Sequence, residues 1–89
     1  MSTIAEAIEL TGLQTITIPP GGKSIAIVVT AGNVHMTITG TGCTGTNIPI
    51  PTGMNLSYAV EDTGQNIRCE VTFTGQLPNT KAVILQTRQ

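Results

Sequence analysis

The sequence predicts an all-β fold, a small antiparallel β-sandwich of jelly-roll or Greek-key type with seven or eight short strands. Apolar and polar residues alternate over several short segments, which is the pattern of half-buried strands. Threonine fills nearly a fifth of the chain, and its branched side chain suits a pleated sheet. Two corners of the form Ile-Pro-x-Gly interrupt the strands and would lead the chain from one sheet to the other.

The chain length and the low charge set the domain organisation and the surface chemistry. A chain of 89 residues supports one hydrophobic core, so we expect an N-terminal segment or arm at residues 1–12 followed by a single β-sandwich domain at residues 13–89. Charged residues make up 10% of the chain, against roughly 25% in an ordinary domain. The net charge of -1 is close to zero, so the surface should oppose association weakly.

The N-terminal segment is compatible with three structures. Thr-Ile-Ala-Glu at 3–6 fits a helix capping box, and Ile4 and Ile8 are spaced for one face of a short helix. Ile4, Ile8 and Leu10 also share the parity of a strand. A third alternative is an arm that buries these side chains on a neighbouring subunit.

The first half of the sandwich contains the clearer strands. Residues 13–18 and 24–30 alternate on either side of the first corner. Residues 34–39 alternate in the same way, and Ala-Gly-Asn at 31–33 has the composition of a turn. We therefore expect residues 24–30 and 34–39 to form a hairpin.

The second half follows a similar course. Residues 40–47 are rich in glycine and predict a loop, and the proline in 47–50 predicts a short strand at a sheet edge. Residues 54–60 and 66–74 predict a second hairpin. The final strand, 80–87, is apolar enough to be covered on both faces for part of its length.

The two corners indicate an internal repeat. Ile-Pro-Pro-Gly at 18–21 and Ile-Pro-Thr-Gly at 50–53 are each followed by strands that end in Thr-x-Thr-Gly, at 37–40 and 72–75. A proline removes one ladder donor and a nearby glycine permits positive φ, so each corner allows a change of sheet. The sequence therefore predicts two equivalent units and a closing strand.

Strand parity also predicts which side chains face the core, including one cysteine. Cys69 shares parity with buried-type neighbours, which favours a free thiol, while a bridge to Cys43 in the glycine-rich loop stays open. Two cysteines cannot form a four-cysteine zinc site, and we predict no metal or cofactor. The residues expected to face the core are Ile25, Ile27, Val29, Val34, Met36, Ile38, Met54, Leu56, Tyr58, Val60, Ile67, Cys69, Val71 and Phe73.

No residue pattern predicts catalysis. His35 lies on the threonine face of its strand with no acidic partner at fixed spacing, so we expect it in solvent. The turn Glu61-Asp62 and Glu70 could supply a carboxylate pair only if they met in space. Gly-Gly-Lys-Ser at 21–24 lacks the first glycine of a phosphate loop and precedes a strand, so Lys23 is expected in solvent at the corner.

Nucleic acid, glycan and membrane binding are disfavoured by composition. The four basic residues form no run, and both aromatic residues fall on core parities, so stacking platforms are absent. No apolar run approaches the roughly 18 residues of a membrane span, and the N-terminus lacks the features of a signal peptide. We therefore expect synthesis in a cytoplasm.

The order of strands and corners resembles small β-rich virion proteins of tailed bacteriophages, which decorate or cement a head or build fibre and tail parts. The resemblance lies in Leu-x-x-Ile-x-Ile-Pro-x-Gly-Gly-x-Ser at 13–24, Ile-Pro-Ile-Pro-x-Gly at 48–53 and Thr-Phe-Thr-Gly at 72–75. It implies a virion subunit without catalysis, a homo-oligomer more often trimeric than dimeric, and contact with the major capsid protein or another virion protein.

The composition, independently of the resemblance, predicts a surface for self-association. Uncharged, threonine-bearing strands and the apolar N-terminal residues can pack against copies of themselves without like-charge repulsion. The candidate interface residues are Ile4, Ile8, Leu10, Thr37 and Thr39. The alternative function is a receptor- or glycan-binding module, with its site in the loops at 40–47 and 61–66.

Overall fold

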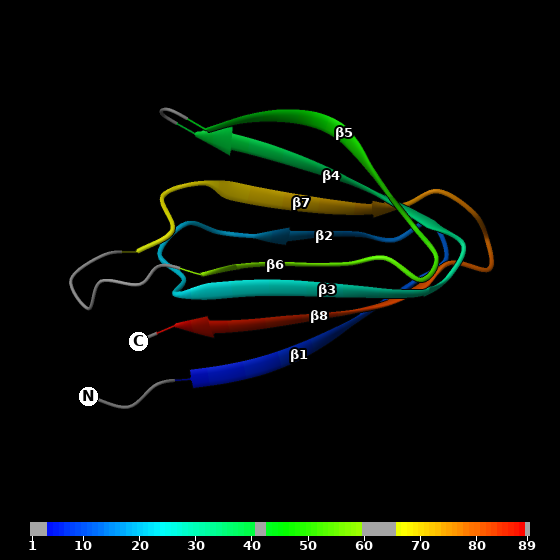
Figure 1. The fold of residues 1–89 in the computed structure, drawn as a ribbon, viewed down its shortest axis with the longest axis horizontal. Coiled ribbons are helices and arrows are strands. Elements are labelled where there is room, and N and C mark those ends of the chain that lie inside the picture. The colour runs from blue at the N-terminus through cyan, green and yellow to red at the C-terminus, as the bar shows by residue number, and fades with distance from the viewer. Residues whose placement is uncertain (1–3, 41–42, 60–65, 89) are drawn as a thin grey trace.

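The protein is a sandwich of two four-stranded antiparallel sheets (Figure 1). The computed structural model describes residues 4–40, 43–59 and 66–88. The strands are β1 (Ile4–Thr11), β2 (Thr15–Ile18), β3 (Ser24–Ala31), β4 (Asn33–Gly40), β5 (Cys43–Pro51), β6 (Asn55–Ala59), β7 (Glu70–Gly75) and β8 (Lys81–Arg88). The predicted fold class and the upper strand number are confirmed.

The connectivity is that of a jelly roll. Sheet A has the order β1-β8-β3-β6, and sheet B has the order β2-β7-β4-β5. The antiparallel pairs β1–β8, β2–β7, β3–β6 and β4–β5 are those of one long hairpin rolled into two layers. Strands far apart in the sequence therefore lie side by side, and the core forms between the layers.

Both Ile-Pro-x-Gly corners carry the chain from sheet B to sheet A, as predicted. The first corner joins β2 to β3, and the second joins β5 to β6. Gly21 has a φ of 107° and Gly53 a φ of 88°, values that a residue with a Cβ adopts only with strain. Ile18 and Ile50, the isoleucines that begin the two corners, are buried at 1% and 0% exposure and hold each corner on the core.

The two predicted hairpins are wrong. β3 lies in sheet A and β4 in sheet B, and the same holds for β6 and β7, so each connection crosses between sheets. At β3 both edges are occupied, by β8 and by β6, which leaves no edge for β4. Alternation specifies which face of a strand is buried but not which strand lies beside it.

A hairpin does form between β4 and β5, where the sequence predicted a glycine-rich loop. Residues 43–47 belong to β5, and Cys43, Thr44 and Gly45 pair with the end of β4. The register shifts between Met36 and Ile38, and Asn47 there has a φ of 51°. This bulge accommodates one extra residue of β5, so that β5 pairs with β4 on both sides of it. The prediction that 47–50 lies at a sheet edge is confirmed, because β5 is the last strand of sheet B.

The internal repeat appears as an approximate twofold arrangement. β3 of the first unit pairs with β6 of the second, and β4 pairs with β7. Thr37 lies opposite Thr72, and these are the first threonines of the two Thr-x-Thr-Gly segments. The equivalent strands therefore lie side by side, at the centre of sheet B and at the β6 edge of sheet A.

The N-terminal segment is a strand of the sandwich, so the helix and arm alternatives are wrong. β1 pairs with β8 along its whole length, from Ile4 opposite Arg88 to Thr11 opposite Lys81. Leu10 is fully buried in the core, and Ile8 packs against it. Residues 4–11 thus belong to the same folded unit as the rest, rather than to an arm that reaches another subunit.

The last strand, β8, is central in sheet A but is covered on one face only. Ala82 and Ile84 are buried in the core, whereas Leu85, which points the other way, is 48% exposed. The expectation of cover on both faces is therefore wrong. Its apolar composition is explained by its position between two neighbouring strands, β1 and β3.

Thr80, the one buried polar side chain among the described residues, joins the end of the sandwich to β4. Its hydroxyl donates to the carbonyl oxygen of Asn33 at 3.2 Å and accepts the N–H of Leu77 at 3.1 Å. Thr80→Val should lower the free energy of unfolding by about 1 to 3 kcal/mol, because the N–H of Leu77 loses its partner and the carbonyl oxygen of Asn33 keeps only the N–H of Gln76. Urea denaturation measures the change.

The matched control is Thr30→Val. Thr30 is exposed, and its hydroxyl donates to the carbonyl oxygen of Lys81 at 3.1 Å. Water can replace this hydrogen bond, so we expect a change within about 0.5 kcal/mol. Equal effects at the two positions would contradict the structural role of Thr80.

Candidate functional site

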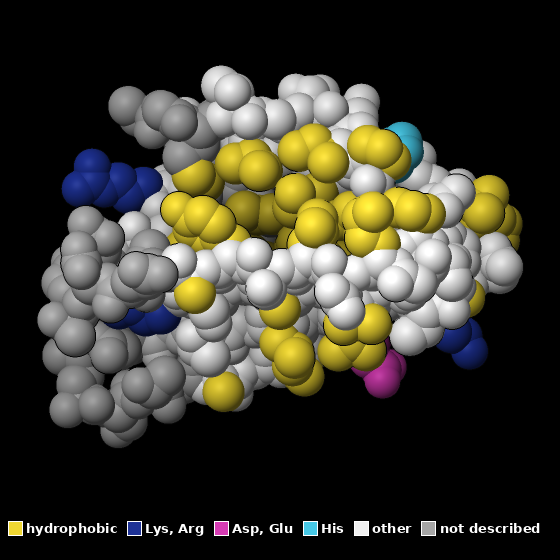
Figure 2. Space-filling model, viewed as in Figure 1, with side chains coloured by type: hydrophobic (Ala, Val, Ile, Leu, Met, Phe, Trp, Pro, Cys, Tyr) yellow, Lys and Arg dark blue, Asp and Glu magenta, His cyan; other side chains and the backbone are white. Residues whose placement is uncertain are grey.

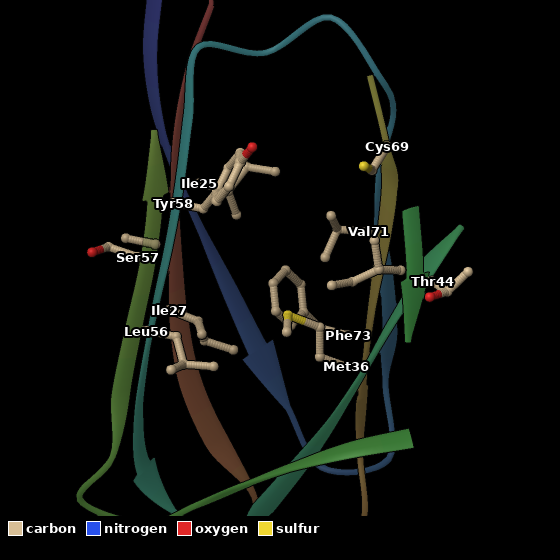
Figure 3. A pocket seen from close by; sticks show the side chains of 12 residues that line it. Ile25, Ile27, Met36, Thr44, Leu56, Ser57, Tyr58, Cys69, Val71 and Phe73 are labelled. Atoms are coloured by element: carbon tan, nitrogen blue, oxygen red, sulfur yellow. The ribbon is translucent and has the colours of Figure 1, made fainter. Parts of the chain in front are cut away.

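A groove opens between the two sheets on the side where β6 ends sheet A. Its volume is about 500 Å³, and its lining comes from β3, β4, β5 and β6, together with β7 and the residue just before it (Figure 3). Most of the lining side chains are aliphatic or aromatic, and none is charged. The groove is therefore an apolar opening into the core rather than a polar cleft suited to catalysis.

Core side chains form the floor of the groove. Ile27 and Phe73 are each 1% exposed, and Ile25 and Val71 are each 7% exposed. Met36, on β4, is half-buried beside them. Figure 2 shows apolar side chains gathered in a hollow across the middle of one face, with the charged side chains in view at the periphery of the molecule.

The β6 strand forms one rim of the groove and is exposed at all five residues. Leu56 and Tyr58 point toward the groove, whereas Ser57 points away from it (Figure 3). Leu56 is 37% exposed and Tyr58 is 63% exposed. The predicted parity of this strand is correct, but the prediction that it is buried is wrong, because no described strand lies beyond β6 to complete the cover.

Cys69 lies at one end of the groove, just before β7, with its sulfur directed toward the cavity (Figure 3). It is half-buried and disulfide-bonded. The free thiol that the sequence favoured is therefore wrong. The only other cysteine in the sequence is Cys43, whose side chain lies outside the described part of the structure.

The outer face of sheet B is a threonine face, defined by Thr15, Thr17, Thr37, Thr72 and Thr74. The hydroxyl oxygens of Thr15 and Thr74 lie 3.4 Å apart, and those of Thr17 and Thr72 lie 3.3 Å apart. These pairs stand directly opposite each other on β2 and β7. The face is thus polar and uncharged, with its hydroxyls partly engaged with one another.

The residues considered for chemistry do not converge on the groove. His35 is half-buried on the threonine side of β4, opposite Thr74, rather than fully in solvent. Lys23 is half-buried at the first corner, so its expected position in solvent is wrong. Glu70 is exposed at the start of β7, and the turn at 61–62 lies outside the described residues.

Within the described parts of the chain, no three His, Cys, Asp or Glu side chains lie together in a way that could hold a metal ion. The same residues contain no helix of the length and hydrophobicity needed to cross a membrane.

The structure separates the predicted interface residues into two groups. Leu10 is fully buried within the chain, so it is unavailable to a partner, and Ile8 is half-buried on the same core. The side chain of Ile4 lies outside the described ones. Thr37 and Thr39 lie on the opposite layer, in β4, where the Thr37 hydroxyl accepts the N–H of Asn47 at 3.2 Å and Thr39 is exposed.

The groove rim at β6 was missed by the sequence prediction. Edge strands usually carry charged residues or proline, whereas β6 has two apolar side chains on one face and no charge, so its composition gave no signal of an edge. Comparisons with protein-family models, with curated proteins and with solved structures find no match for this chain.

Proposed function

We propose that the chain is a non-enzymatic structural subunit of a virion, most simply a capsid decoration or cement protein, which associates with itself and binds the particle surface. The observation that carries the proposal is the open apolar groove, with its exposed rim, on a chain that is 10% charged. Apolar surface of this kind, rimmed by polar residues, is typical of association sites.

The fold and the disulfide are compatible with this function. Jelly rolls occur in viral capsid proteins and also in lectins and other families, so the fold agrees with the proposal without selecting it. A disulfide persists in oxidising surroundings, which include the surface of a released virion. The virion assignment itself depends on the resemblance of strands and corners to phage structural proteins.

The threonine face is the second surface that supports a structural role. Its five threonines are uncharged, and at its edge Thr39 is exposed opposite Glu70. The threonines can pack on the major capsid protein or another virion protein, with the charge of Glu70 at the rim of the contact. The groove serves the receptor- or glycan-binding alternative less well, because its aliphatic lining offers few hydrogen-bond partners to a sugar.

Two measurements test the proposal. Mass spectrometry of purified particles of the virus that encodes the chain should find it in many copies. Size exclusion coupled to light scattering should give a multiple of the chain mass of 9.2 kDa. A single species at 9.2 kDa across the micromolar range, together with absence from the particles, would contradict both the self-association and the virion role.

A further inference from the structure

Among the described residues, β6 is an edge strand of sheet A. The approximate twofold arrangement pairs β3 with β6, and the other edge of β3 is filled by β8. The other edge of β6 pairs with no strand in the described part of the chain. The groove opens at this place, with Leu56 and Tyr58 of β6 on one rim and Thr44 of β5 among the lining residues of the other.

We propose that β6 of a second copy fills this position, paired antiparallel with β6 about a twofold axis at Ser57. The two A sheets would then continue into one eight-stranded sheet, and the two grooves would close against each other. This inference builds on the self-association in the proposed function and specifies its surface and symmetry. It favours a twofold pair over the trimer that the family resemblance implies.

The backbone of β6 has hydrogen-bonding groups directed to its free edge. The N–H of Val29 donates to the carbonyl oxygen of Met54 at 3.4 Å, just before β6 begins. Alternate residues of an antiparallel strand direct their backbone groups to the same side, so those of Leu56 and Tyr58 also face β3. The N–H and C=O groups of Asn55, Ser57 and Ala59 therefore point to the free edge of β6, where a second strand can form hydrogen bonds with them.

The sequence of β6 is complementary to itself in this register. With Ser57 opposite its own copy, Asn55 lies opposite Ala59, and all five residues of the strand find a partner. Leu56 then lies opposite Tyr58 of the second copy in a pair that is not hydrogen-bonded, where side chains approach most closely. Both side chains point into the groove, so the pairing covers it with apolar surface (Figure 3).

The charge distribution also favours a second copy as the occupant. No residue of β6 is charged, and no side chain that lines the groove is charged, so two copies meet without like-charge repulsion. A partner strand bearing lysine or glutamate would have to bury its charge in this apolar opening. Five-residue strands bury less than the roughly 1,600 Å² of a standard interface, so we expect dissociation constants in the micromolar range.

Size exclusion coupled to light scattering, over roughly 10 to 500 µM, tests the pairing. The wild-type chain should approach twice its mass of 9.2 kDa. Ser57→Pro removes an outward N–H, a change that an edge strand tolerates, and Tyr58→Lys places a charge opposite Leu56. Each should raise the dissociation constant at least about tenfold, and far-ultraviolet circular dichroism should report an unchanged β signal.

Leu85→Lys and the pair Thr37→Lys with Thr39→Lys are the matched controls. Leu85 is 48% exposed on the outer face of sheet A, and the two threonines lie on the threonine side of β4. Both variants add charge away from β6 and should leave the dimer intact. Dissociation by either control, or insensitivity to both Ser57→Pro and Tyr58→Lys, would overturn the pairing at β6.

The remaining outcomes separate this inference from the proposed function. A trimer, or a dimer insensitive to the β6 variants, overturns the twofold pairing and leaves a self-associating structural subunit. A wild-type monomer at all concentrations overturns the twofold pairing as well, and the presence of the chain in purified particles then decides the virion role separately.

Discussion

Gly75→Ala should lower the free energy of unfolding by at least about 3 kcal/mol. Gly75 is buried at the end of β7, and a Cβ built there would collide with the carbonyl oxygen of Gly12 and lie 3.1 Å from a methyl carbon of Leu10. The obstacle at Gly12 is backbone, so no side chain can rotate away. The N–H of Gly75 also donates to the carbonyl oxygen of Gln14 at 3.0 Å, which holds the two segments together.

Gly22→Ala is the control for this prediction. Gly22 is buried as well, but a Cβ there would come no closer than 3.4 Å to the carbonyl oxygen of Thr87. We expect a change of about 1 kcal/mol or less. Chemical denaturation of both variants measures the difference, and a Gly75 variant as stable as the Gly22 variant would show that the β1–β2 turn does not pack against β7 as described.

Leu10→Ala should lower the free energy of unfolding by about 2 to 5 kcal/mol. Leu10 is fully buried among the core residues, so the substitution leaves a cavity between the sheets. If the N-terminal segment were an arm for a neighbouring subunit, this change would weaken assembly and spare the fold. Deletion of residues 1–10 should likewise unfold the domain, because it removes most of a strand that pairs along β8.

Leu13→Ala provides the matched comparison, since Leu13 is 64% exposed and lies three residues away. The same substitution there should change stability by no more than about 0.5 kcal/mol. Thermal denaturation at one protein concentration, combined with light scattering, separates a loss of folding from a loss of assembly. A folded Leu10 variant with impaired assembly would restore the arm interpretation.

Local patterns predicted the fold class and the faces of most strands. Ile25, Ile27 and Val29 share one strand parity and all three are buried, whereas Val28 between two of them is 41% exposed. Gly21 and Gly53 occupy positive φ at the two corners, as their place after proline suggested. These features depend on a residue and its close neighbours, through the period of a strand and the backbone freedom of glycine, so they can be read along the chain.

The assignment of strands to sheets could not be predicted in this way. β3 and β4 look like a hairpin, yet β3 pairs with β8 and β6, and β4 lies in the other sheet. The N-terminal segment fitted a helix and a strand equally, with an arm as a third alternative, and its pairing with β8 decides for the strand. Long-range pairing is selected by total burial, which no local segment specifies.

At the candidate site, the local sequence predicted the orientation of the side chains but not their exposure. The alternation of β6 predicted that Leu56 and Tyr58 share one face, and they do. Their exposure follows from the end of sheet A at β6, a property of the strand order rather than of the strand. Parity is a consequence of backbone geometry within one segment, whereas burial requires other residues packed over that face, which the segment itself does not specify.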